Sequence, residues 1–172
     1  MALESLRELL ARELMDLYGA ETQVLKALPN MAKAAATPGL KQALEHHLTE
    51  TEGQAARLEQ CFGLLGLAVR GSQCKGMEGL VAEANEMMDE EGPDPVVDAG
   101  LIGSAQRVEH YEIAAYGSAI AFAELLGETQ VAGLLRRTLE EEQAADRVLT
   151  RLARGEVNET ALAAGTRITE SG

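Results

Sequence analysis

The sequence is poor in aromatic residues and in cysteine, and each deficit excludes a class of protein. Phe, Trp and Tyr make up 3% of its 172 residues and Trp is absent, so Leu, Ala, Val and Met have to fill the core, which favours helices. The two cysteines, Cys61 and Cys74, are too few for a disulfide framework and lack the C-x-x-C spacing of a zinc site. This cysteine usage fits a reducing compartment, and we expect a cytoplasmic protein.

Positive charge and long apolar runs are also scarce. Fifteen Lys and Arg stand against 28 Asp and Glu, a formal net charge of −13, which repels phosphate backbones and anionic lipid surfaces. No run approaches the roughly 18 uninterrupted apolar residues of a membrane span, and residues 1–12 do not resemble a signal peptide. We therefore expect neither nucleic acid nor a membrane as a partner. The acidic field attracts metal cations, although acidity also serves solubility alone.

Proline and glycine mark where helices begin and end. Thr37-Pro38 and Asp94-Pro95 each have the form of an N-cap followed by a first helical residue, and Gly127 and Gly155 resemble C-terminal stops. This punctuation predicts long helices over about 2–36, 38–66, 95–126 and 128–154.

The connection between the second and third helices is longer than the others, and within it Met77 to Glu90 has weak helical periodicity. Two tight antiparallel hairpins joined by one long crossover is the connectivity of ferritin-like folds. We predict one all-α domain, residues 1–155, that forms a ferritin-like antiparallel four-helix bundle with a short helix in the crossover. The polar residues 156–172 are expected to form a flexible C-terminal tail.

Three of the predicted helices carry one central glutamate on an otherwise apolar stripe. Steps of three and four residues keep side chains facing a bundle axis, and such steps pass through Glu21, Glu112 and Glu142. Glu109 precedes Glu112 by one turn and Asp146 follows Glu142 by one turn, so both could reach the same place.

The second helix has a polar patch at this position instead of a lone carboxylate, through His47, Glu50, Thr51 and Gln54. Residues equidistant from a tight antiparallel turn lie side by side. Glu112 and Glu142 are equidistant from Gly127, and the midpoint between Glu21 and Glu50, at position 35.5, lies next to the turn at Thr37-Pro38. Four glutamates are therefore predicted at one level of the bundle.

A cluster of buried carboxylates needs positive charge, because even one isolated buried carboxylate costs several kcal/mol or is neutralised. The arginines, Arg57 among them, map mostly to other helix faces. Two divalent metal ions would neutralise the cluster, and a carboxylate-rich site with few nitrogen ligands suits iron or manganese better than zinc. A single glutamate on such a stripe is more often a boundary residue that reaches solvent. The prediction of a metal site therefore rests on four glutamates lying at the same depth in the bundle.

Several strings resemble the ferritin-like stress-protein family of the YciE/YciF type, a domain of unknown function. The match runs from about residue 3 to residue 153 and rests on DLYGAETQ (16–23), ETEGQAARLE (50–59), CKGMEGL (74–80), QRVEHYEIAAY (106–116) and EEEQAAD (140–146). The resemblance implies a ferritin-like bundle with a dinuclear metal centre, in bacterial proteins linked to stress responses.

In the wider ferritin-like pattern two helices each supply one Glu and the other two each supply Glu-x-x-His. By resemblance, Glu21 and Glu112 take the first role and Glu50 and Glu142 begin the paired motifs. The expected histidines are missing, since Gly53 and Ala145 stand there and Gln54 and Asp146 follow them. His47 could supply the nitrogen ligand, or could be a hydrogen-bonded interior histidine. His110 is expected to be exposed.

The leading hypothesis is a redox-active protein with two divalent metal ions, iron ahead of manganese or zinc, that acts on peroxide, oxygen or ferrous iron under stress. The predicted metal ligands are Glu21, Glu50, Gln54, Glu109, Glu112, Glu142 and Asp146. The alternative is a non-catalytic helical stress protein that acts through oligomerisation, and a homodimer is expected in either case. Cys74 could be redox-active if Lys75 lowers its pKa, or could be an inert thiol.

Overall fold

The computed structural model describes residues 3–170, with side chains described as far as residue 165, and this part of the chain contains helices and no strand. The elements are α1 (Leu6–Ala34), α2 (Pro38–Leu64), α3 (Lys75–Asp89), α4 (Asp94–Leu125), α5 (Thr129–Leu152), the π-helical turn η1 (Ala153–Val157) and α6 (Asn158–Glu170). The four long helices begin and end within about one turn of the predicted positions.

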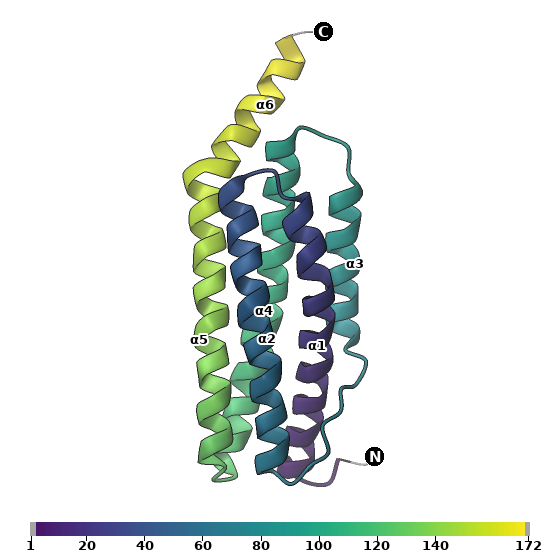
Figure 1. Cartoon of the computed structure of the whole chain (residues 1–172), viewed down its shortest axis with the longest axis vertical. Helices are drawn as coiled ribbons and strands as arrows, with labels where there is room; N and C mark the ends of the chain where they lie inside the picture. Colours follow the sequence, from purple (N-terminus) through teal and green to yellow (C-terminus); the bar gives the residue numbers. More distant parts are fainter. Residues whose placement is uncertain (1–2, 171–172) are drawn as a thin grey trace.

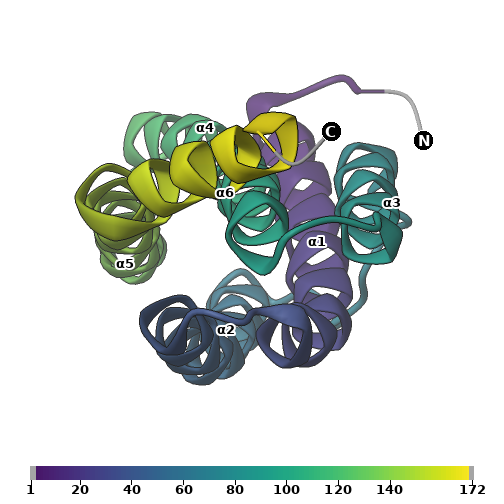
Figure 2. The same cartoon turned by 90° about the horizontal axis from the view of Figure 1, so that it is seen from above.

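The four long helices α1, α2, α4 and α5 form an antiparallel bundle (Figures 1 and 2). The α1–α2 turn lies at the upper end in Figure 1 and the α4–α5 turn at the lower end, so the chain between α2 and α4 has to run the length of the bundle. This crossover carries α3, which packs on the outside against α1 and α4. The predicted ferritin-like connectivity and the short crossover helix are confirmed.

Two helix boundaries show how the sequence sets the chain's direction. Ser5 and Glu8 form a capping box at the start of α1, in which each side chain accepts a hydrogen bond from the other's backbone. At the end of α4, Gly127 follows the C-cap residue Leu126 and has a φ of 74°. Only glycine adopts this left-handed conformation without strain, so α4 turns sharply into α5.

The prediction that a helix stops at Gly155 is wrong. Gly155 lies inside η1, and α6 continues from Asn158. A π-helical turn accommodates an extra residue without ending the helix, and Val157, 1% exposed, holds this turn against the core. The flexibility of residues 156–172 stays a prediction, and residues 171–172 of that stretch lie outside the described residues.

The crossover lies directly against α1 because Gly19 has no side chain. The Ser72 amide donates a hydrogen bond to the Met15 carbonyl at 2.9 Å. A Cβ atom on Gly19 would lie 1.9 Å from the Ser72 carbonyl oxygen, a distance that real contacts do not reach. Gly19 therefore fixes the path of the chain as it leaves the lower end of the bundle.

The core consists of two apolar clusters separated by a polar layer. One cluster contains Val24, Leu44, Val108 and Leu149, and the other contains Leu17, Leu58, Tyr116 and Leu135, with further residues in each. Each of the four long helices contributes to both clusters and has polar side chains between its two contributions. These polar side chains form the candidate site.

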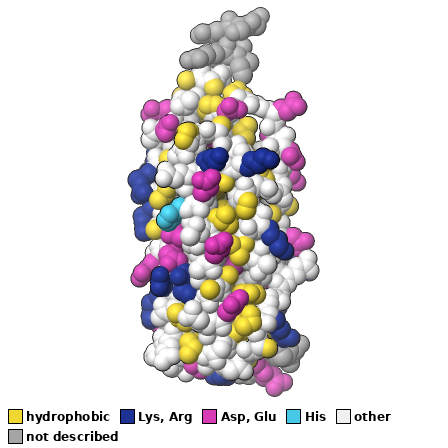
Figure 3. All heavy atoms as spheres, viewed as in Figure 1, with side chains coloured by type: hydrophobic (Ala, Val, Ile, Leu, Met, Phe, Trp, Pro, Cys, Tyr) yellow, Lys and Arg dark blue, Asp and Glu magenta, His cyan; other side chains and the backbone are white. Residues whose placement is uncertain are grey.

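Charged side chains cover much of the outside. On the face shown in Figure 3, Lys and Arg are interspersed with Asp and Glu and do not gather into one basic patch. Among the described residues, no helix combines the length and the apolar character that crossing a membrane requires.

Candidate metal centre

Four helices bring five titratable side chains to one level between the two apolar clusters. Glu21 comes from α1, His47 from α2, Glu109 and Glu112 from α4, and Glu142 from α5, and none of them is more than 4% exposed. Each lies on or one turn from an apolar stripe, so the packing of leucines above and below carries it into the interior. The predicted depth agreement holds for Glu21, Glu112 and Glu142.

The ligand-type atoms of this cluster lie close together. His47, Glu109, Glu112 and Glu142 each offer an atom that lies within 4.8 Å of those of the other three. The His47 Nε2 atom lies 3.3 Å from a Glu109 oxygen and 3.7 Å from a Glu142 oxygen. Neither approach has hydrogen-bond geometry, since both His47 nitrogens lack a hydrogen-bond partner. The side chains converge on one point without satisfying one another.

Nine buried side-chain nitrogen and oxygen atoms among the described residues have no hydrogen-bond partner, and all but the Gln54 Oε1 atom belong to this cluster. Glu112 and Glu142 have both carboxylate oxygens without partners. Each unsatisfied buried polar group costs about 1–3 kcal/mol, more when it is charged. The cluster is thus unfavourable as it stands, and a bound cation would relieve it.

Burial and mutual repulsion raise the pKa values of the acids in the cluster. Burial is the main cause of the high pKa of Glu21, Glu109 and Glu112, and neighbouring carboxylates, Glu142 for each of the three, raise these values further. The Tyr116 hydroxyl donates a hydrogen bond to Glu21 and opposes the rise in its pKa. A metal ion would reverse the balance by favouring the ionised carboxylates.

One arginine lies closer to the cluster than the sequence indicated. Arg57 was expected on another helix face, but it is 8% exposed and near enough to Glu21 to lower the pKa of that carboxyl. Its side chain is long enough to cross from α2 to α5, where it donates to the Thr138 hydroxyl at 3.0 Å and pairs with Glu141. Arg57 is therefore already paired, and it leaves most of the cluster's charge uncompensated.

The remaining predicted ligands occupy the margin of the cluster. The Glu50 carboxylate is 24% exposed and lies 3.3 Å from His46 Nδ1 and 3.6 Å from His47 Nδ1. Gln54 is fully buried, and its Nε2 atom lies 3.4 Å from Glu141. Both stay candidates for ligands that reach the cluster from α2.

Asp146 is not among the four side chains whose ligand-type atoms converge. Its carboxylate is 20% exposed, accepts a hydrogen bond from Gln106 Nε2 at 2.9 Å and lies 3.4 Å from His110 Nε2. His110 is 65% exposed, as its helical phase predicts. Glu109, which like Asp146 was predicted to lie one turn from a stripe glutamate, is one of the four side chains whose ligand-type atoms converge.

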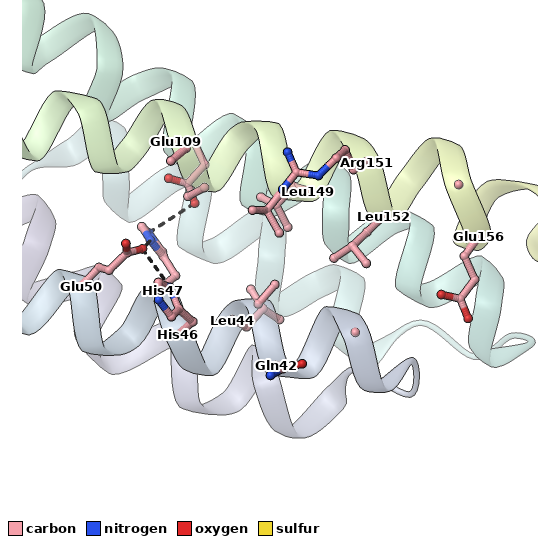
Figure 4. A pocket seen from close by; sticks show the side chains of 16 residues that line it. Gln42, Leu44, His46, His47, Glu50, Glu109, Leu149, Arg151, Leu152 and Glu156 are labelled. Carbon is pink, nitrogen blue, oxygen red and sulfur yellow. Dashed lines mark ion pairs between the residues drawn. The ribbon is translucent and has the colours of Figure 1, made fainter.

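A groove between α2 and α5 leads from the surface to the cluster (Figure 4). It has a volume of about 630 Å³, and His47, Glu50 and Glu109 lie at its inner end. Leu44 of α2 and Leu149 of α5 face one another farther along it. The inner end is polar and the middle is apolar, so the groove gives small molecules access to the cluster.

Cys74 lies outside the cluster and does not have the lowered pKa that would make it reactive. It is fully buried, and burial raises the pKa of its thiol. Its sulfur lies 2.9 Å from the Tyr111 hydroxyl and 3.1 Å from an Asp16 oxygen. The suggested influence of Lys75 is absent from the causes of this shift, which favours the inert thiol.

Comparison with known proteins gives matches over nearly the whole chain. The family described as "Domain of unknown function (DUF892)" matches residues 5–162. Protein YciF of Escherichia coli (strain K12) is 43% identical over 162 residues, which cover 94% of this chain and 98% of YciF. The crystal structure of the E. coli stress protein YciF superimposes with a TM-score of 0.87 over 90% of this chain and 98% of that one. YcfI from Rhodopseudomonas palustris is 42% identical, with a TM-score of 0.84 over 86% of this chain and 94% of that one.

Proposed function

The chain belongs to the DUF892 family and is a homologue of the stress protein YciF, and from that premise we propose that it is a ferritin-like protein with a dinuclear metal centre. The observation that carries the proposal is the group of eight buried ligand atoms without hydrogen-bond partners on Glu21, His47, Glu109, Glu112 and Glu142. Natural proteins rarely leave buried polar atoms unpaired, and so many in one place indicate a missing ligand.

The donor set indicates which metals fit. Four carboxylates and one imidazole supply hard oxygen ligands and one nitrogen, which suits iron or manganese better than zinc. His47, Glu109, Glu112 and Glu142 would hold one ion, since their ligand atoms already converge. Glu21, with one oxygen held by Tyr116 and the other free, would serve a second ion together with Glu50 or Gln54. Asp146 would join only if its side chain turned away from Gln106.

Iron or manganese bound here would supply the ability to change oxidation state. The protein's own groups would hold and shield that centre. The apolar clusters above and below exclude water, the Tyr116 hydroxyl keeps Glu21 oriented, and the groove admits reactants at His47 and Glu109. We propose a redox reaction with peroxide, oxygen or ferrous iron in a stress response, in a cytoplasmic homodimer.

The proposal is tested by purifying the chain without a metal-chelating tag and measuring iron, manganese and zinc per chain. Loss of peroxide and oxidation of ferrous iron are then followed for wild type and for Glu112→Gln, with the exposed Glu140→Gln as a control of equal charge change. We expect metal and turnover in wild type and in the control, and a loss of both in Glu112→Gln. A metal-free native protein with no turnover after iron is added would support the non-catalytic alternative that acts through oligomerisation.

A further inference from the structure

A series of ligand-type side chains connects the exterior of the protein with the buried cluster. The exposed fraction of these side chains falls along the series, from 72% at His46 to 24% at Glu50 and 5% at His47. We propose that His46 and Glu50 form an outer capture site for a divalent cation, which then passes through His47 into the cluster. The inference rests on the proposed function, because it describes how the same metal centre is filled.

Each step from one residue of the series to the next is shorter than 4 Å. The Glu50 Oε2 atom lies 3.3 Å from His46 Nδ1 and 3.6 Å from His47 Nδ1 (Figure 4). On the other side of its ring, His47 Nε2 lies 3.3 Å from Glu109 Oε1 and 3.7 Å from Glu142 Oε2. His47 therefore turns one nitrogen toward the capture site and the other toward the cluster, and a cation can exchange ligands in short steps.

His47 distinguishes this arrangement from an ordinary ion pair on a helix surface. His46 and Glu50 are four residues apart on α2, a spacing at which oppositely charged side chains commonly pair without binding anything. Behind them, however, His47 is 4% exposed and neither of its ring nitrogens has a hydrogen-bond partner. Buried nitrogen atoms are rarely left unpaired. Two such atoms that face opposite ways indicate a ligand on each side of the ring.

The charges of the groove also favour a cation. Apart from the histidines, its charged lining consists of three glutamates and one arginine, Glu50, Glu109, Glu156 and Arg151. Such a negative field concentrates cations and repels anions. Leu44 and Leu149, farther along, are 2% and 4% exposed and belong to one packed apolar cluster. The cation is therefore expected to enter at the polar end, where His46 and Glu50 lie (Figure 4).

Stopped-flow tyrosine fluorescence of the metal-free protein mixed with manganous ion measures how fast the cluster fills. The chain has no Trp, and the Tyr116 hydroxyl donates a hydrogen bond to Glu21 in the cluster, so tyrosine emission should change when the ion arrives. His46→Ala removes a nitrogen ligand of the capture site and should slow filling about fivefold or more. Its equilibrium affinity, from calorimetric titration, should stay within about twofold of wild type, so release to excess chelator should slow by the same factor as filling.

His110→Ala is the matched control, because the His110 side chain is 65% exposed and also lies near a carboxylate, 3.4 Å from Asp146. This variant should fill at the wild-type rate. His46→Asp keeps a cation ligand at the capture site and should fill at least as fast as wild type. Arg151→Gln removes the positive charge from the groove and should speed filling about twofold at low salt.

The inference is overturned if His46→Ala and His110→Ala fill at the same rate, if His46→Asp is as slow as His46→Ala, or if Arg151→Gln fills more slowly than wild type. In each of these cases wild type still binds manganous ion at equilibrium, so the metal proposal stands and only the route is wrong. A wild-type protein that binds neither manganous nor ferrous ion in the titration would contradict the proposed function and the route together.

Discussion

Replacing Glu112 by glutamine should stabilise the metal-free protein, an unusual outcome for a change in the core. Glu112 is fully buried, neither of its oxygens has a hydrogen-bond partner, and burial together with repulsion from Glu21 and Glu142 raises its pKa. Glutamine keeps the shape of the side chain, removes the ionisable group and offers an amide donor to the neighbouring carboxylates. We expect a gain of about 2 kcal/mol at pH 8, from the usual cost of about 1–3 kcal/mol for an unsatisfied buried polar group.

The gain should depend on pH in a defined direction. A carboxyl whose folded pKa is raised contributes fully to stability below its unfolded pKa, near 4.3, and that contribution is lost as pH rises through the folded pKa. Each such group lowers stability by about 1.4 kcal/mol per pH unit while it is protonated in the folded state and ionised in the unfolded state. The metal-free wild type should therefore melt at a lower temperature at pH 8 than at pH 5, and Glu112→Gln should lose less.

Differential scanning calorimetry in the presence of a chelator measures this effect. A gain of about 2 kcal/mol corresponds to a rise in Tm of about 4–8 °C for a chain of this size. Glu140→Gln, an exposed change on α5, should shift Tm by less than about 1 °C. A Tm for Glu112→Gln that falls at pH 8, or one that matches Glu140→Gln at both pH values, would refute the argument that the cluster is strained without metal.

Three further variants test individual contacts. His47→Ala should weaken binding of ferrous or manganous ion about 10–100-fold, as measured by calorimetric titration. The side chain of His46 is 72% exposed, so His46→Ala should change the affinity less than about twofold. Equal losses in the two variants would remove His47 from the ligand set. Tyr116→Phe should lower stability by about 1–3 kcal/mol in chemical denaturation, because Glu21 loses its hydrogen bond in the interior. Tyr18→Phe, which removes an exposed hydrogen bond to Glu59, should cost less than about 1 kcal/mol, and a larger cost at Tyr18 would contradict the burial argument. Gly19→Ala should lower Tm by several degrees, because the new methyl group displaces the Ser72 backbone. A Cβ atom on Gly117 would meet no atom within 4 Å, so Gly117→Ala should raise stability by about 0.5–1 kcal/mol. An unchanged Tm for Gly19→Ala would show that the crossover does not need this close approach.

The fold could be predicted because its signals are local. Proline at the start of α2 and α4 and glycine after α4 set the helix boundaries, and the apolar stripes gave the inward faces of α1, α4 and α5. Where local signals compete, the prediction was less accurate. Gly155 resembles a stop, but the burial of Val157 keeps the chain helical.

The helical phase of α2 places His47 in the interior and Glu50 at the margin, although Glu50 was the predicted ligand. The buried residues of α2 include Leu40, Leu44, His47, Thr51, Gln54, Leu58 and Cys61. These positions follow steps of four and three residues through His47 and not through Glu50, the same rule that located the other glutamates. Continuing that stripe from Leu44 to Leu58 was the signal in the sequence that could have placed His47 inside and Glu50 at the margin.

Other features of the site depend on tertiary contacts that no periodicity encodes. Glu109 and Asp146 each lie one turn from a stripe glutamate, yet Glu109 points inward and Asp146 pairs with Gln106 across the α4–α5 seam. Arg57 reaches Thr138 and Glu141 because α2 and α5 pack closely enough for a long side chain to cross. The direction in which these side chains point is decided by distances between helices.

The most direct measurement is X-ray diffraction from crystals grown with ferrous iron, with data collected above and below the iron absorption edge. The account predicts anomalous difference density at two positions among Glu21, His47, Glu109, Glu112 and Glu142, present only above the edge. Crystals in which those side chains surround ordered water, or rearrange into hydrogen-bonded pairs with no anomalous density, would contradict it.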